Sequence, residues 1–281
     1  MRKTVLILAI MLSFNAYADE LPSCGINCTY SLVQNGMDKN NNPTYTLIME
    51  PIDKSKEAST IGSSTCSTTP CSNTSLWANS SITKVEFKEG ITTIGGATLE
   101  FMSSVTSISL PEGLKTIATE SLNSTSVSHL DIPSSVTSIG NYGLAMGRLE
   151  SINGLPQGLT SIGDYTFTST KISNLVIPDS VTTISKEAFS RGSDTAIQTL
   201  YCSEALQSQC EAAVQWKKDL GQTVNVVPYQ KYGNSYYYDG KFYASPNDII
   251  GNHYIQKRIY TIDEANLVAK STGNSVKIRY R

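Results

Sequence analysis

One segment of this chain recurs at a nearly constant interval, and that interval constrains the fold more than any other feature. The copy LDIPSSVTSIG at residues 130–140 returns as LVIPDSVTTIS at residues 175–185. Aligned copies begin at Ile82, Val105, Val127, Leu149 and Ile172, and an incomplete one at Ile197. The starts are therefore 23, 22, 22, 23 and 25 residues apart. A period of about 20 to 29 residues is typical of leucine-rich solenoids, whereas a β-sandwich would show turn signals every ~8–12 residues.

Each copy has two apolar edges, and this explains why copies must stack. Leu130 and Ile132 are separated by one residue, so they point the same way from an extended strand. Pro133 ends that strand because proline cannot donate to a β-ladder. Val136 and Ile139 then form a second inward-pointing pair. One copy cannot bury both edges alone, so the sequence predicts a mainly β solenoid of stacked parallel strands.

The motif L-x-I-P-x-x-V-T-x-I-G resembles the BspA-like class of leucine-rich repeats found in microbial surface proteins. The resemblance covers about residues 82–202, and it implies adhesion or host-surface binding. Gly140, at the end of the motif, is expected to permit the tight bend that follows. The Ala-Phe pair common in this class is clear only at Ala188-Phe189. We expect looser packing where other pairs replace it, at Thr166-Phe167, Gly143-Leu144 and Ser121-Leu122.

Residues 19–81 are expected to cap the first end of the solenoid. The stretches CGINCTYSLVQNG and TYTLIMEP alternate apolar and polar residues around an Asn-rich turn, which predicts a hairpin. This resembles the strand-rich segment that precedes the repeats in the same family. Residues 53–80 are rich in Ser, Thr and Asn, and they fit either a loop or a disordered segment.

Residues 203–228 are expected to close the second end with a helix and a linker. Ser203 is a candidate N-cap and Gly221 a candidate stop. Four residues share one face at helical spacing: Leu206, Cys210, Ala213 and Val214. Burying this face would bring Cys210 back onto Cys202.

Residues 229–281 are expected to form a small α+β C-terminal unit. They hold nine of the 15 tyrosines, and eight Lys or Arg against four Asp or Glu. The sequence predicts a hairpin around Asp239-Gly240, a short helix from Thr261 to Ala269 and a closing strand over residues 276–280. Two roles fit this composition. The tyrosines can form the core of a capping unit, or they can attach the protein to an anionic polymer of the cell envelope.

The amino terminus has the organisation of an export signal. Arg2 and Lys3 precede an apolar run at residues 5–14, and residues 16–18 form a small-x-small cleavage site. The run is shorter than the ~20 apolar residues that span a bilayer. We therefore predict cleavage after Ala18, no transmembrane helix, and a secreted, periplasmic or cell-surface location.

The cysteines fit an oxidising compartment. Six are present, in three close couples: Cys24 with Cys28, Cys66 with Cys71, and Cys202 with Cys210. Local disulfides are the simplest expectation, although six cysteines allow other pairings. No metal site is expected, because Cys-x2-Cys spacing is absent and neither histidine lies near a couple.

Catalysis is not expected from the sequence. It contains no Gly-x-Ser-x-Gly, His-Glu-x-x-His, phosphate-loop or dinucleotide glycine motif, so no cofactor is expected either. A triad of Ser107 or Ser109 with His129 and Asp131 is a remote alternative, because nothing is expected to orient the imidazole. The formal net charge of −2 argues against nucleic-acid binding.

The outward positions of the first strand in each copy form the best candidate binding surface. These strand-face residues are Lys84, Glu86, Ser107, Ser109, His129, Asp131, Ser151, Asn153, Asn174, Val176, Thr199 and Tyr201. Such a row suits a large partner, either a protein or a glycan on a host or neighbouring cell. The alternatives are a solvated surface without a partner, an envelope structural protein attached through residues 229–281, and, more remotely, a hydrolase.

Overall fold

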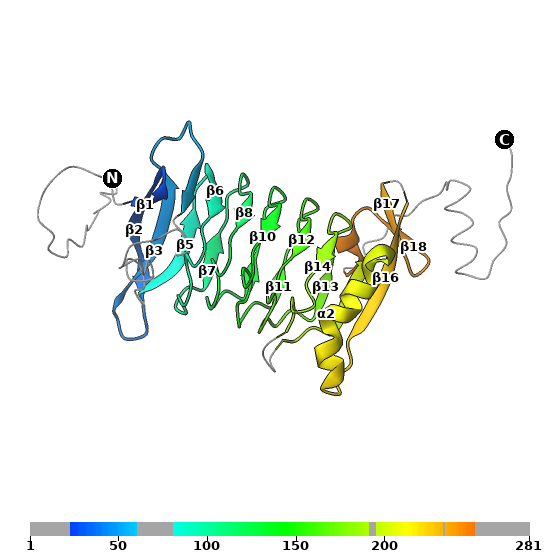
Figure 1. Ribbon diagram of the computed structural model, residues 1–281. Coiled ribbons are helices and arrows are strands. Elements are labelled where there is room, and N and C mark those ends of the chain that lie inside the picture. Colours follow the sequence, from blue (N-terminus) through cyan, green and yellow to red (C-terminus); the bar gives the residue numbers. More distant parts are fainter. Residues whose placement is uncertain (1–22, 61–80, 191–194, 233, 251–281) are drawn as a thin grey trace, which may run out of the picture.

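The computed structural model describes residues 23–60, 81–190, 195–232 and 234–250, and it shows a row of stacked coils between two different end structures (Figure 1). Each coil contributes a strand to one or both of two rows. The first row contains β5 (Ile82–Phe87), β7 (Ser107–Ser109), β9 (His129–Leu130), β11 (Ser151–Ile152), β13 (Asn174–Val176) and β15 (Thr199–Ser203). The second row contains β6 (Ile91–Ile94), β8 (Thr116–Ile117), β10 (Ser138–Ile139), β12 (Ser161–Ile162) and β14 (Thr183–Ile184).

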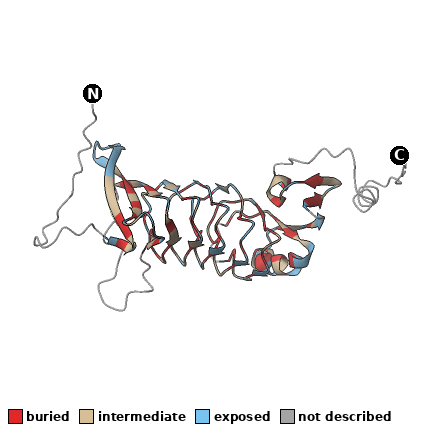
Figure 2. Cartoon of the chain, turned by 90° about the horizontal axis from the view of Figure 1, so that it is seen from above, coloured by how far each residue is buried: buried red, intermediate tan, exposed pale blue. Residues whose placement is uncertain are grey.

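The predicted parallel stacking is confirmed by the register. Lys84 lies opposite Ser107, His129 opposite Ser151, and Asn174 opposite Thr199. These pairs are equivalent positions of successive copies. Buried and exposed residues alternate around the coils (Figure 2).

Apolar columns run through the interior of the coils. The second strand row supplies one column, whose members are at most 6% exposed: Ile94, Ile117, Ile139, Ile162 and Ile184. The turns that follow each second-row strand make up the third side of the coils. They supply another column, whose members are at most 1% exposed: Leu99, Leu122, Leu144, Phe167 and Phe189. Complete burial of one such side chain contributes about 1.5–3 kcal/mol, so the columns dominate the stability of the coils.

The expected loosening on the third side is not found. The Phe167 and Phe189 rings stack with centroids 5.3 Å apart, and leucine fills the same column in the other coils. Where the Ala-Phe pair becomes Gly143-Leu144, a Cβ at Gly143 would lie 2.9 Å from Ile139 Cγ2. The coil that has the small Gly143 beside Leu144 is therefore packed closely at this point.

Gly140 is required for a different reason from the one predicted. Its φ lies outside the left-handed region, but a Cβ there would lie 2.5 Å from the backbone nitrogen of Thr119 in the preceding coil. The left-handed bend falls two residues later, at Tyr142 with φ 56°. Its backbone N–H donates to the Asp164 carbonyl of the next coil at 3.1 Å, and that bond holds the strained residue in place.

The N-terminal strands continue both rows and so cover the edges of the first coil. They are β1 (Ser23–Ile26), β2 (Cys28–Met37), β3 (Pro43–Pro51) and β4 (Ala58–Thr60). The predicted hairpin is confirmed by antiparallel pairing of β2 with β3. Strand β3 pairs with β5, and β4 pairs with β6. An exposed sheet edge is a template for aggregation, and this arrangement removes it from both rows at once.

Two of the three expected disulfides fall on described residues, and both are formed. Cys24 pairs with Cys28 across the β1–β2 turn. Cys202 pairs with Cys210, which joins the last coil to the closing helix. Cys66 and Cys71 lie outside the described residues, as do residues 1–22 with the predicted export signal.

A helix closes the second row. The 3₁₀ turn η2 (Glu204–Leu206) leads into α2 (Gln207–Asp219), which is labelled at the end of the coils in Figure 1. The Gln209 side chain accepts from the Ile184 N–H at 2.8 Å and donates to the Thr182 carbonyl at 3.2 Å. One amide thus takes the place of the next strand beside β14.

The predicted helix face is buried, with Leu206, Cys210, Ala213 and Val214 at most 4% exposed. Lys217 is also buried, and its Nζ donates to the carbonyls of Thr195 at 2.7 Å and Ile197 at 3.0 Å. Burial lowers the pKa of this ammonium group. The predicted stop is confirmed, because Gly221 has φ 76° just beyond the helix. The predicted cap is wrong: the Ser203 side chain makes no capping bond.

The C-terminal unit continues the first row. Strand β16 (Asn225–Tyr232) pairs in parallel with β15, and β17 (Ser235–Tyr238) and β18 (Lys241–Tyr243) extend the same sheet. The expected hairpin turn is confirmed at Asp239-Gly240, with φ 46° and 76°, and the 3₁₀ turn η3 (Pro246–Ile249) follows. The boundary expected after residue 228 thus lies inside β16. The helix and strand predicted beyond residue 260 lie outside the described residues.

Candidate functional site

The strand-face residues lie along one side of the first strand row. Lys84, Ser107, Ser109, His129, Asp131, Ser151, Asn153 and Asn174 are exposed, whereas Glu86 and Thr199 are half-buried. Because the pairing is in register, Glu86 lies opposite Ser109. The side chains from neighbouring coils therefore form a surface of hydroxyl, amide and charged groups.

The C-terminal unit covers the far end of this surface, which the sequence did not predict. Val176 is only 1% exposed, because it packs with Tyr229, Tyr236, Tyr243 and Ile249 of that unit. The predicted outward position of Val176 is therefore a core position. Half-buried Tyr201 meets the Tyr238 ring edge-on, with centroids 5.6 Å apart, so it is not a freely exposed recognition residue. Strands β17 and β18 of this unit are coloured largely as buried in Figure 2.

Polar contacts fasten the C-terminal unit in this position. The Tyr229 hydroxyl donates to the Ile177 carbonyl at 2.7 Å. The Asp179 carboxylate accepts from the Tyr236 hydroxyl at 2.9 Å and from Lys231 Nζ. Burial raises the pKa of both Tyr229 and Tyr236. In the described residues, the tyrosines thus serve as the core of a cap.

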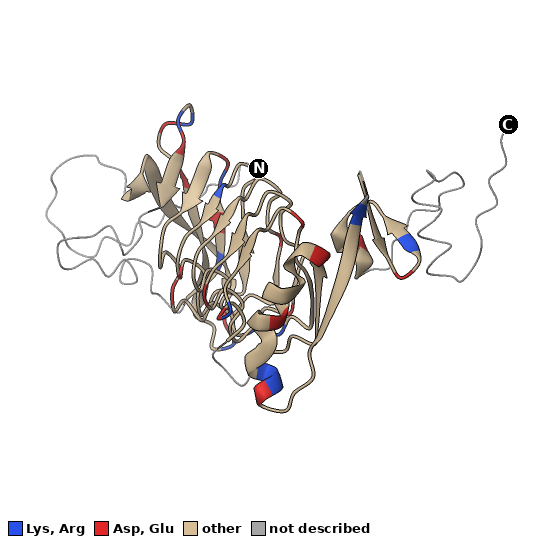
Figure 3. Cartoon of the chain, turned by 45° about the vertical axis from the view of Figure 1, so that its right-hand side comes forward, with Lys and Arg blue, Asp and Glu red and all other residues tan. Residues whose placement is uncertain are grey.

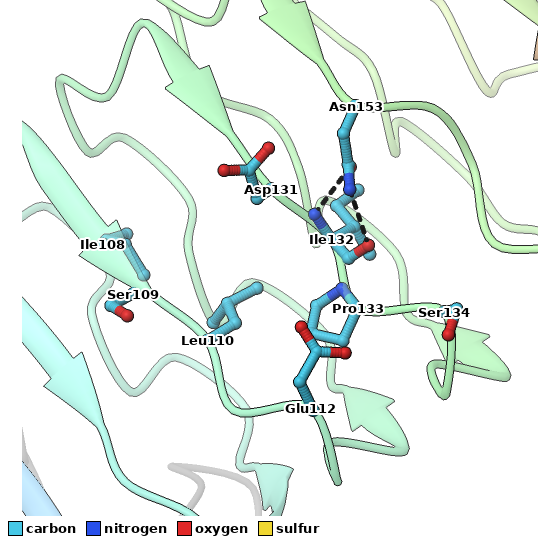
Figure 4. A pocket seen from close by; sticks show the side chains of 9 residues that line it. All are labelled: Ile108, Ser109, Leu110, Glu112, Asp131, Ile132, Pro133, Ser134 and Asn153. Atoms are coloured by element: carbon cyan, nitrogen blue, oxygen red, sulfur yellow. Dashed lines mark hydrogen bonds between the residues drawn. The ribbon is translucent and has the colours of Figure 1, made fainter.

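The uncovered part of the surface is interrupted twice. Strand β7 ends one sheet, β9 pairs only with β11, and β13 begins another sheet, among the strands that the structure describes. A hollow lies at each interruption. That between β7 and β9 measures about 430 Å³ (Figure 4), and that between β11 and β13 about 330 Å³.

The second interruption follows from one extra residue. The copy that begins at Leu149 has Asn153-Gly154 where its neighbour has a single residue, and Gly154 adopts φ 114°. The Asn153 side chain accepts from the Ile132 N–H at 2.8 Å and donates to the Ile132 carbonyl at 3.2 Å. Asn153, predicted to bind a partner, therefore uses its amide to prolong the β9–β11 pairing.

The C-terminal unit also forms part of the second hollow. Asn247 of η3 packs against Gly154, where a Cβ would lie 2.2 Å from Asn247 Nδ2. Asn247 and Ile250 line this hollow together with Ser151 and Asn174 of the strand face. The described end of the chain at residue 250 thus lies at its rim.

The first hollow combines apolar and acidic groups. Its lining includes Ile108, Leu110, Ile132 and Pro133, and the polar residues Ser109, Glu112, Asp131, Ser134 and Asn153. Sequence reasoning did not select Glu112 or Ser134, because both follow the strand. A signal was present, since each directly follows the proline of its copy, and equivalent positions lie side by side in a solenoid.

A serine, a histidine and an aspartate form a hydrogen-bonded chain on the strand face. His129 Nδ1 lies 2.8 Å from Ser151 Oγ, and Nε2 lies 3.1 Å from Asp131 Oδ1. The expectation that nothing orients this imidazole is wrong, and the serine is neither of the two considered. However, the side chains of His129 and Asp131 are 54% and 75% exposed. A catalytic triad keeps its aspartate buried, so this chain matches a surface network better than a hydrolase site.

The described part of the chain contains neither a membrane-spanning helix nor a cluster of metal-binding side chains. No helix there is long and apolar enough to cross a bilayer. No group of three or more His, Cys, Asp or Glu side chains there is placed to hold a metal ion.

The chain resembles known repeat proteins at low sequence identity. Among curated protein sequences, none matches it. A leucine-rich repeat protein from Eubacterium ventriosum has 19% identity and a TM-score of 0.43 over 58% of this chain and 40% of its own. A leucine-rich cell surface protein from Faecalibacterium prausnitzii has 18% identity and a TM-score of 0.36 over 80% of this chain and 58% of its own.

A third structure, a leucine-rich repeat protein from T. pallidum, has 15% identity and a TM-score of 0.33 over 72% of this chain and 80% of its own. The match to the Eubacterium ventriosum protein spans only about two fifths of that protein's length. A family model described as BspA type leucine-rich repeat region matches six copies over residues 72–195. Together with the register of the coils, this match identifies residues 72–195 as a BspA-type leucine-rich repeat region.

Proposed function

We propose that this protein is an exported recognition protein that binds a macromolecular partner, a protein or a glycan, through the uncovered strand face of β5 to β11. Adhesion to a host or neighbouring cell is the role that this binding serves. The observation that carries the proposal is the pair of hollows where the strand row is interrupted, about 430 and 330 Å³ in volume, each lined in part by strand-face residues. Stacked coils create extended binding surfaces of this kind in other solenoids.

Two other observations support binding by the coils rather than by the ends. Both ends of the described solenoid are covered, by β1 to β4 at one end and by α2 and β16 to β18 at the other. The described tyrosines of the C-terminal unit are mostly buried. The described part of residues 229–250 therefore presents no exposed tyrosine cluster, which would be needed to support envelope attachment through residues 229–281.

Export is part of the proposal. Two disulfides on described residues suit an oxidising compartment, and the export signal predicted at residues 1–18 supplies the route. Detection of a mature amino terminus at Asp19, by sequencing protein recovered outside the cytoplasm, tests this step. A mature protein that still begins at Met1 would contradict it.

A matched pair of substitutions tests the binding face. Ser151→Tyr places a bulky side chain on the strand face, and Ser161→Tyr places the same side chain on an exposed position of the second row. We expect Ser151→Tyr to weaken retention of the full chain on cells, or on arrays of matrix proteins and glycans, by at least about tenfold. Ser161→Tyr should bind as the parent does. Equal binding by both variants would overturn the proposal.

The hydrolase alternative has its own test. A fluorophosphonate probe labels activated serines, and we expect it to label neither the parent nor Ser151→Ala above background. Labelling of the parent that disappears in Ser151→Ala would show that the chain of Ser151, His129 and Asp131 is catalytic.

A further inference from the structure

The hollow between β7 and β9 has an accessible apolar floor. Where a strand is joined on both sides, its inward residues are covered by neighbours, as Val85 of β5 is at 1% exposure between β3 and β7. Beside the interruption, Ile108 and Leu110 are only partly buried, and both line the hollow. Figure 4 shows Leu110 between the Asp131 and Glu112 side chains in that view. The surface therefore offers aliphatic contact next to carboxylates.

The hollow is acidic and lacks a compensating cation. Glu112 and Asp131 are its charged lining residues, and no Lys or Arg lines it. Among the described residues, the Glu112 carboxylate has neither a hydrogen bond nor an ion pair, and Asp131 pairs only with His129. Lys88, on the neighbouring coil, is already paired with Glu86. Charged residues are sparse along the coils (Figure 3), and the Glu89 carboxylate, which accepts from the Glu112 N–H at 3.1 Å, adds to the negative charge beside the hollow.

We propose that this hollow receives a lysine or arginine side chain of a protein partner. The methylene groups of that side chain pack on Ile108 and Leu110, and its cation lies between the Glu112 and Asp131 carboxylates. Lysine and arginine bury their aliphatic stems on apolar surface while the charged head pairs outside, and charge complementarity orients such contacts. The inference rests on the proposed function and makes the partner of the strand face a protein with an exposed basic side chain.

A neutral glycan suits the hollow less well than a basic peptide. Sugar hydroxyls can bond to the carboxylates but leave both negative charges uncompensated, and the floor offers no aromatic ring among its lining residues. The cation of a lysine or arginine side chain compensates the two carboxylates, and its methylene groups cover the aliphatic floor.

Peptides that differ at one position test the inference on the full chain. The probes are acetylated, amidated Gly-Ser-X-Ser-Gly with X as lysine, arginine or norleucine, titrated into isotopically labelled protein and followed by NMR. We expect saturable shifts at Ile108 and Leu110 with lysine and arginine, weakened by salt, and no saturation with norleucine. Norleucine binding as tightly as lysine would overturn the proposal.

Substitutions in the hollow provide the second measurement. Glu112→Gln combined with Asp131→Asn should weaken lysine-peptide binding about tenfold, since each removes one charge pair. Glu112→Gln alone should weaken it about threefold without touching the His129 contact. Glu57→Gln, which changes an exposed carboxylate just before β4 that lines neither hollow, should have no effect. Unchanged affinity in the double variant would refute the inference.

The two proposals fail in different ways. If Ser151→Tyr abolishes binding to cells while no basic peptide binds, the strand face binds something other than a basic side chain, and only the inference falls. If basic peptides bind but Ser151→Tyr leaves cell binding intact, the strand face at β11 is not where the cell partner binds, and the proposed function falls.

Discussion

Replacing Gly140 with alanine tests whether the coils approach one another as closely as the structure shows. The added Cβ would lie 2.5 Å from Thr119 N and 2.9 Å from both Ala118 C and Thr119 Cα. These are backbone atoms of the preceding coil, so they cannot rotate away as the end of a side chain could. The Gly140 N–H also donates to the Ile117 carbonyl at 2.8 Å, which ties the two coils together at this point.

The expected loss of stability follows from that geometry. Relieving the overlap requires two hydrogen-bonded coils to separate locally, and overpacking of this kind costs about 1–3 kcal/mol. In a chain of this size, 1 kcal/mol shifts the Tm by about 2–4 °C. Gly140→Ala should therefore lower the Tm by about 2–12 °C, measured by circular dichroism, with the urea midpoint falling in parallel.

Gly147 provides a matched control in the same coil. A Cβ there meets nothing within 4 Å, and its φ lies outside the left-handed region. Gly147→Ala should raise stability by about 0.4–1 kcal/mol, because alanine restricts the unfolded chain. Equal stability of the two variants would refute the close-approach argument. The preceding coil holds Ala118 in the same slot of the repeat, so the requirement comes from the neighbouring backbone and not from the turn itself.

Four further substitutions probe the core, the strand face and the cap. Ile139→Asp should unfold the solenoid because it buries an unpaired charge, whereas Ser109→Asp on the exposed face should leave the Tm nearly unchanged; equal damage would mean that the faces are assigned wrongly. Lys217→Met should cost about 2–4 kcal/mol in urea unfolding, since two buried carbonyls lose their donor; an unchanged midpoint would contradict this. Tyr229 has its pKa raised by burial from an ordinary 10.0. Above that pH only the unfolded state releases the phenolic proton, so stability should fall by up to about 1.4 kcal/mol per pH unit, and the fall should be shallower in Tyr229→Phe. Parallel curves for the two proteins would show that Tyr229 does not titrate in this way.

The repeat made the coils predictable because its information is local and periodic. Leu130 and Ile139 could be assigned to inward columns from spacing alone, and both are at most 4% exposed. The close cysteine couples on described residues and the buried face of α2 followed from the same kind of short-range pattern. A wrong assignment of a residue to the inward or outward side in one copy can be recognised from the neighbouring copies, since equivalent residues must stack.

The candidate site was less predictable, because it depends on departures from the repeat. One extra residue at Asn153-Gly154 turns an expected recognition residue into a structural one. Ser151 meets His129 because their strands are in register, but the rotamers that orient the imidazole are set by packing. Glu112 matters only because the strand row is interrupted beside it, and spacing does not reveal an interruption.

The sequence by itself determined the stacked coils, their two strand rows and the side of each coil that faces inward. Periodic apolar residues can be buried only by copies of themselves. The tertiary structure alone decided how much of the strand face stays open. The bond from Tyr229 to Ile177 joins residues 52 apart, and that from Tyr236 to Asp179 joins residues 57 apart. Contacts between residues so far apart in the chain do not follow the repeat period. The covering of Val176 by the C-terminal unit is therefore visible only in the folded structure.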